Sequence, residues 1–164
     1  VAKDTALINS DSSFRFYIKD EAKELEKQKR LTEERVKAMN NFIEINKSEL
    51  KFNAVFVAIV VAKGENLVDA RLKSPMVKTN IVMDYANEHP DKFNRLVTDK
   101  TLQDKAFIET LIANGELRRA EFNQQIMTAD GDFIGSNISE AIAFFNNPNN
   151  KALRDGYENK IKLL

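Results

Sequence analysis

The chain has 164 residues, 30% of them charged, and its 25 basic residues are balanced by 25 acidic ones. This balance argues against a dedicated nucleic-acid-binding protein, because phosphate contacts normally require a basic excess. With no cysteine and a single histidine, the sequence excludes disulfides, thiolate zinc sites, iron–sulfur clusters and histidine-rich metal sites.

Residues 1–19 are predicted to form an extended arm. After a polar stretch, Phe14, Phe16 and Ile18 alternate with polar or amphipathic residues, a period-two pattern typical of a β-strand. No hairpin partner follows nearby, so such a strand must pair at a distance or on another chain. We therefore expect Phe14, Phe16 and Ile18 to bind a partner. The alternative is that the segment folds back and completes the core of the chain itself.

Residues 20–46 are predicted to form one long helix, because they contain no glycine or proline. Twelve of the eighteen residues from 20 to 37 are charged, six of each sign, which is typical of a solvated face. Apolar residues recur at spacings of three and four, namely at Ala22, Leu25, Val36, Met39 and Ile43. Lys29 and Thr32 interrupt this series. We expect a solvated shaft that packs firmly only from Val36 onward, and we favour this over a coiled coil, which needs unbroken heptads.

Residues 47–164 are predicted to form a helical domain. Ser48 can cap a helix that ends at Gly64, and its apolar run at 54–62 would also suit a buried strand. That run has nine residues, against the roughly 20 that a membrane span needs, so no membrane partner is expected. Further helices are expected at 76–87, 91–97 and from 102 to the stop at Asn114-Gly115.

The C-terminal part is predicted to contain one β-hairpin near 117–135, because Asp130-Gly131 separates two short apolar runs. Asn137 can then open a helix over 138–145, and residues 151–164 are expected to form the last helix. A helix, a hairpin and another helix in this order resemble a winged-helix module. The predicted fold class is therefore mainly α, with a winged-helix-like C-terminal part, a long charged helix and an extended arm.

No motif in the sequence supports catalysis, a cofactor or a metal. Asp130 and Asp132 flank Gly131, but aligning this glycine with a calcium loop places Ile126 and Asn137 where acidic ligands are required. His89 precedes a proline at a helix break, with no recognisable catalytic partner. The five glycines are scattered rather than gathered in a phosphate-binding loop. We expect no enzymatic activity, no catalytic residue, no cofactor and no metal ligand.

DNA binding through the hairpin is the alternative function. Arg118 and Arg119 would lie at the start of the wing and could contact phosphates. Between residues 116 and 140, however, two basic residues stand against five acidic ones. Because acidic side chains at the wing tip repel phosphates, protein contacts are favoured over nucleic acid.

Several segments together resemble small proteins encoded by tailed bacteriophages. They are the extended start at 14–20, the segments 85–93 and 96–99, residues 107–119, and residues 134–150. The resemblance covers most of the chain and implies a virus-encoded, non-enzymatic component of the virion that is made in the host cytoplasm. The predicted function is a structural protein that assembles with copies of itself or with other virion proteins. The alternative is a DNA-binding or DNA-packaging accessory protein.

Overall fold

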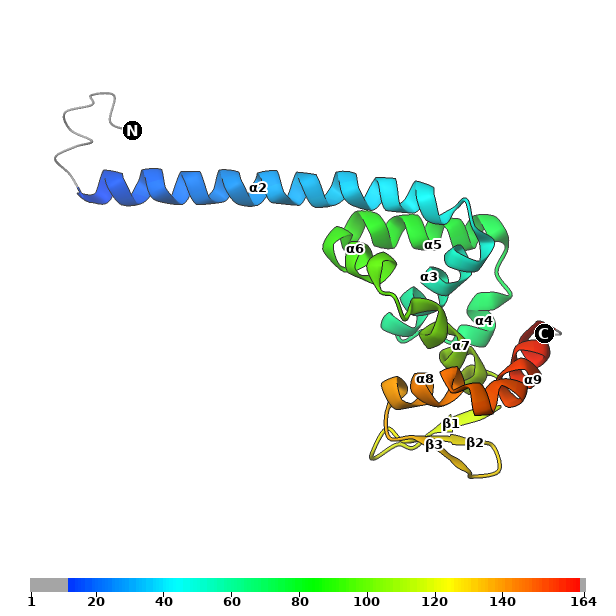
Figure 1. The fold of residues 1–164 in the computed structure, drawn as a ribbon. Coiled ribbons are helices and arrows are strands. Elements are labelled where there is room, and N and C mark those ends of the chain that lie inside the picture. The colour runs from blue at the N-terminus through cyan, green and yellow to red at the C-terminus, as the bar shows by residue number, and fades with distance from the viewer. Residues whose placement is uncertain (1–11, 163–164) are drawn as a thin grey trace.

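The computed structural model describes residues 12–162, and it describes side chains from residue 18 onward. The predicted fold class is confirmed at the level of architecture, because the described chain is mainly helical, with eight α-helices and a small sheet (Figure 1). In chain order the elements are α2 (Ser12–Ile45), α3 (Glu49–Ala62), α4 (Leu67–Arg71), α5 (Pro75–Glu88), α6 (Pro90–Thr98), α7 (Leu102–Ala113), β1 (Leu117–Arg119), β2 (Ile126–Thr128), β3 (Phe133–Gly135), α8 (Ile138–Asn146), the 3₁₀ helix η1 (Pro148–Asn150) and α9 (Lys151–Lys162).

Helix α2 is a long shaft that extends well beyond the body of the molecule (Figure 1). Residues 18–33 are exposed throughout, and only the C-terminal part of the helix is packed, through Ala38, Phe42 and Ile45. The extended conformation expected at Phe14–Ile18 is wrong, because the helix already begins at Ser12. A helix pairs its own backbone groups, whereas a lone strand leaves them unpaired. The earlier part of the predicted arm, residues 1–11, lies outside the described residues.

The larger of two hydrophobic cores is built around α3. Its apolar run is helical, as predicted, and supplies six buried residues: Ala54, Val55, Phe56, Val57, Ile59 and Val60. The Ser48 side chain accepts a hydrogen bond from the backbone nitrogen of Lys51 at 3.4 Å, so the predicted cap is confirmed. Helices α2, α4, α5, α6 and α7 surround α3. Among the described helices, none combines the length and apolar character needed to cross a bilayer.

The smaller core joins α7 and α8 to a three-stranded antiparallel sheet of order β1-β2-β3. The Asp130-Gly131 turn connects β2 to β3, and Gly131 adopts a φ of 100° that favours glycine. The single predicted hairpin is incomplete, however, because residues 117–127 divide into two strands, β1 and β2, with their own turn. The likeness to a winged helix stays a prediction.

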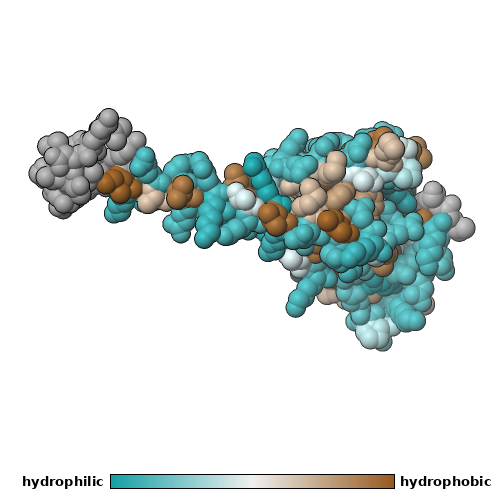
Figure 2. Space-filling view, turned by 90° about the horizontal axis from the view of Figure 1, so that it is seen from above, coloured by the Kyte–Doolittle hydropathy of each residue, from teal (hydrophilic) through white to brown (hydrophobic). Residues whose placement is uncertain are grey.

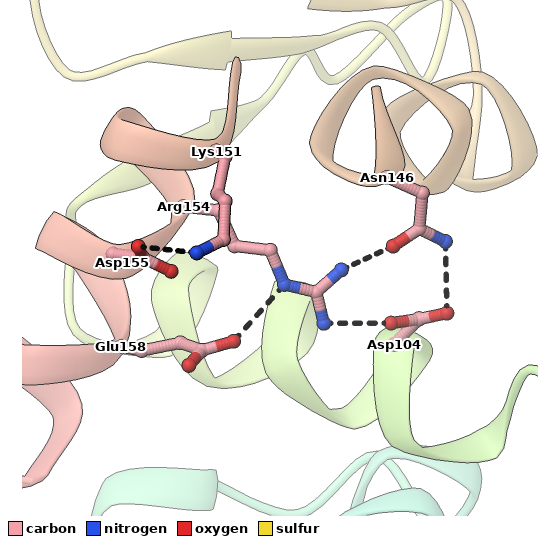
Figure 3. A network of polar contacts seen from close by, with 6 residues as sticks. All are labelled: Asp104, Asn146, Lys151, Arg154, Asp155 and Glu158. Atoms are coloured by element: carbon pink, nitrogen blue, oxygen red, sulfur yellow. Dashed lines mark hydrogen bonds and ion pairs between the residues drawn. The ribbon is translucent and has the colours of Figure 1, made fainter. Parts of the chain in front are cut away.

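A polar network at Arg154 fixes α9 against α7 and α8 (Figure 3). Its guanidinium donates to Asp104 at 2.9 Å, to Glu158 at 3.0 Å and to the side-chain oxygen of Asn146. The same guanidinium lies 5.3 Å from the ring centre of Phe107. Burial lowers the pKa of Arg154, but the hydrogen bonds to the two carboxylates outweigh it and the pKa is raised. The C-terminal helix is thus held by charge-assisted contacts across three elements.

Candidate interaction surface on helix α2

The described part of the chain offers little that resembles a catalytic site. Within it, no three His, Asp or Glu side chains are grouped so that they could hold a metal ion. His89 ends α5 and begins α6, and its ring packs edge-on against Tyr85 with 5.2 Å between ring centres. This arrangement gives His89 a packing role at the junction of the two helices.

One face of α2 is attached to α6 by a buried amide. Asn94 of α6 is 3% exposed, and its side-chain nitrogen donates to the backbone oxygen of Glu34 at 3.0 Å and to its carboxylate at 2.7 Å. Its side-chain oxygen accepts a hydrogen bond from Asn41 at 2.8 Å. Because a buried amide without partners is costly, these bonds favour one position of α2 on α6. The direction in which the shaft leaves the body is fixed there.

The opposite face of α2 carries an exposed apolar stripe. Its large side chains are each between 44% and 72% exposed: Ile18, Leu25, Val36, Met39 and Ile43. Figure 2 looks down on α2, and brown hydrophobic side chains recur along it between teal hydrophilic ones. As expected, only the second half of the helix packs, but it packs through Ala38, Phe42 and Ile45 and not through the apolar positions Val36, Met39 and Ile43. We call this set of five residues, together with Ala22, the α2 stripe.

The two faces can be compared by helical geometry. At about 100° per residue, the packed positions 34, 38, 41 and 45 point roughly 170° away from the stripe positions 36, 39 and 43. The C-terminal half of α2 therefore has two apolar sides, and only one of them contacts the body. The stripe continues without a change of face into residues 18–25, where every residue of α2 is exposed.

A groove of about 670 Å³ lies where the shaft leaves the body, between α2 and α6. It is lined mainly by charged side chains, five basic and three acidic: Lys23, Lys27, Arg30, Lys37, Arg95, Glu26, Glu34 and Asp91. Among the described residues, Leu31 is the only large apolar one on its wall. Ligand pockets are usually lined mainly by apolar groups with a few polar ones, and this groove has the reverse composition.

The two arginines predicted to contact nucleic acid are engaged within the domain. Arg119 forms an ion pair with Glu109 at 2.6 Å, and both side chains are largely covered. Arg118 is exposed, and its guanidinium donates to the backbone oxygen of Ala129 across the sheet. Phe122, in the turn between β1 and β2, is fully exposed. Phe122 was not among the predicted site residues, although a lone aromatic residue in a polar turn was the available signal.

The three residues predicted to bind a partner lie on α2, and the structure describes the side chain of one of them, Ile18. Ile18 is 48% exposed and belongs to the α2 stripe. Phe14 and Phe16 are helical in backbone conformation, and their side chains lie outside the described residues. The helical backbone from Ser12 onward removes the strand geometry on which this prediction rested, and partner binding by the three residues stays a prediction.

Comparison with known proteins adds no family to this description. No protein-family model matches the chain, and neither the curated proteins nor the solved structures yield a match.

Proposed function

We propose that this chain is a non-enzymatic assembly protein that binds other protein through the α2 stripe. The observation that supports the proposal is the exposure of five large apolar side chains along one face of a helix whose other face holds the body. Contiguous exposed apolar surface typically marks a site of protein association. Amphipathic helices commonly bind partners through residues spaced in this way.

The unsupported length of the shaft favours the same function. Residues 18–33 are all exposed, so tertiary packing contributes little to that part of the helix. Most of the stability of helices in proteins comes from the tertiary packing of an amphipathic face. One ion pair of the shaft, between Lys27 and Glu24 at 3.9 Å, is highly exposed and contributes little. A bound partner would supply the packing that this segment lacks.

From the resemblance to small proteins of tailed bacteriophages, we further propose that the assembly is a virion and that the chain is made in the host cytoplasm. Its partners are then copies of itself or other virion proteins, and no cofactor or metal takes part. DNA binding remains the less favoured alternative, because Arg119 is already paired with Glu109. The acidic residues near the hairpin also disfavour phosphate.

Two experiments test the proposal. Mass spectrometry of purified particles from the source should detect the chain at a fixed copy number. Val36→Glu, which places a charge in the stripe, should abolish its incorporation, whereas Leu72→Glu, which places the same charge at an 81% exposed apolar position outside α2, should be incorporated normally. Absence of the wild-type chain from particles would contradict the virion assignment. Binding to duplex DNA that falls steeply with added salt would favour the alternative.

A further inference from the structure

The α2 stripe has the spacing of a coiled-coil seam. Beginning at Ile18, the residues on this face follow one another at intervals of four, three, four, three, four, three and four, which is the spacing of a heptad register, although Lys29 and Thr32 interrupt its apolar series. The eight positions are Ile18, Ala22, Leu25, Lys29, Thr32, Val36, Met39 and Ile43. Six of the eight are apolar, and the seam spans about 38 Å at 1.5 Å per residue.

The two polar positions lie at the centre of this seam and are symmetric about its midpoint. If an identical helix lies antiparallel with Lys29 against Thr32 of the second copy, each remaining layer pairs two apolar residues. These layers join Ile18 to Ile43, Ala22 to Met39, and Leu25 to Val36, and each occurs twice. A parallel arrangement would instead place Lys29 against its own copy. The pattern is therefore self-complementary only in the antiparallel direction.

Charge along the shaft favours the same direction. Residues 20–26 carry four acids and one base, whereas residues 35–41 carry two bases and no acid. In the antiparallel register these two segments lie opposite each other, so opposite net charges meet. In a parallel pair the acidic segment would lie beside itself, and like charges would repel.

We infer that α2 pairs with the α2 of a second copy of this chain, antiparallel and with Leu25 against Val36 of the second copy. The inference rests on the proposed function, because it names the partner of the same surface. The body does not obstruct this pairing through its contacts with α2, since those contacts use the face roughly opposite the seam. The two bodies would then lie near opposite ends of the paired helices.

Cysteine cross-linking of the full chain tests the geometry, because the natural sequence has no cysteine to interfere. A tagged Leu25→Cys chain is mixed with an untagged Val36→Cys chain and treated with a short bis-maleimide. We expect the mixed cross-linked dimer to exceed the product of either variant alone at least fivefold. The matched control pairs Lys27→Cys with Val36→Cys, because position 27 lies on the far side of the helix from the seam.

Three results would overturn the inference. Each variant cross-linking efficiently to itself would indicate parallel pairing. A mixed yield no higher than that of the control would indicate random collision. A monomer at all concentrations, with no cross-link, would mean that a second copy is not the partner of the seam. The proposed function fails on separate observations, namely absence of the chain from particles or normal incorporation of Val36→Glu.

Discussion

Replacing Asn94 with Asp probes the attachment of the shaft with a nearly isosteric change. The substitution removes the amide nitrogen that donates to the backbone oxygen and the carboxylate of Glu34. It also places a second carboxylate 2.7 Å from the first, because the new oxygen occupies the position of that nitrogen. A neutral hydrogen bond contributes about 0.5–1.5 kcal/mol and one to a charged group about 1.5–3 kcal/mol. We therefore expect a loss of about 3 kcal/mol in the free energy of unfolding at pH 7.

The pH dependence of this loss distinguishes its cause. Burial and the neighbouring carboxylate should raise the pKa of the introduced carboxyl above its value in the unfolded chain. The penalty is then largest above that raised pKa and falls as the pH drops through it, because the protonated carboxyl can again donate a hydrogen bond. Relative to wild type at the same pH, we expect less than half of the loss at pH 4.

Urea unfolding followed by circular dichroism at pH 7 and pH 4 measures both quantities. At about 2–4 °C per kcal/mol for a chain of this size, thermal unfolding should show a decrease in Tm of roughly 6–12 °C at pH 7. Asn40→Asp is the matched control, because Asn40 lies exposed on the same helix and should change stability by less than about 0.5 kcal/mol. A loss below about 1 kcal/mol for Asn94→Asp, or an equal loss at both pH values, would refute the reasoning.

Three further predictions concern the body. Lys105 holds the pKa of Asp99 at about 2, so Asp99→Asn should lower the free energy of unfolding by about 1 kcal/mol at pH 7 after allowance for solvent screening. Urea titrations should show this loss disappearing as the pH falls from about 4 to 2. Gly135→Ala should lower the free energy of unfolding in urea by about 1–3 kcal/mol, because the new Cβ would lie 2.7 Å from a backbone nitrogen of α8. Gly156→Ala has open space in α9 and should raise the free energy of unfolding by up to about 1 kcal/mol. Arg154→Met should lose about 2 kcal/mol or more by the same assay, because two carboxylates lose their partner; an unchanged midpoint would show that the network is not stabilising.

Much of the helical body could be predicted because local chemistry fixes it. The Asn137 side chain accepts a hydrogen bond from the backbone nitrogen of Glu140 at 3.0 Å, and the Glu140 carboxylate accepts one from the backbone nitrogen of Ser136 at 2.8 Å. Such caps depend on residues only a few positions apart. The Asp130-Gly131 turn was predictable for the same reason, since it requires a positive φ that glycine adopts readily.

The errors arose where the sequence allowed two solutions. Residues 34–45 present two apolar sides, and Val36 with Met39 is the more hydrophobic pair, yet the body contacts the side that contains Ala38 and Phe42. That choice depends on α6, whose Asn94 is distant in sequence and could not be assigned to α2 from spacing alone. The alternation at Phe14 and Phe16 was also ambiguous, because a short period-two pattern can continue a helix when no strand partner exists.

Sedimentation equilibrium of the full chain over a range of concentrations tests the central claim most directly, namely that the α2 stripe is the binding surface and a second copy its partner. Wild type should approach twice the 18.7 kDa mass of the chain as concentration rises. Val36→Glu should remain a monomer, while Leu72→Glu, at an exposed apolar position outside α2, should dimerise like wild type. A wild-type chain that stays monomeric throughout, or a dimer that Val36→Glu leaves intact, would contradict the claim.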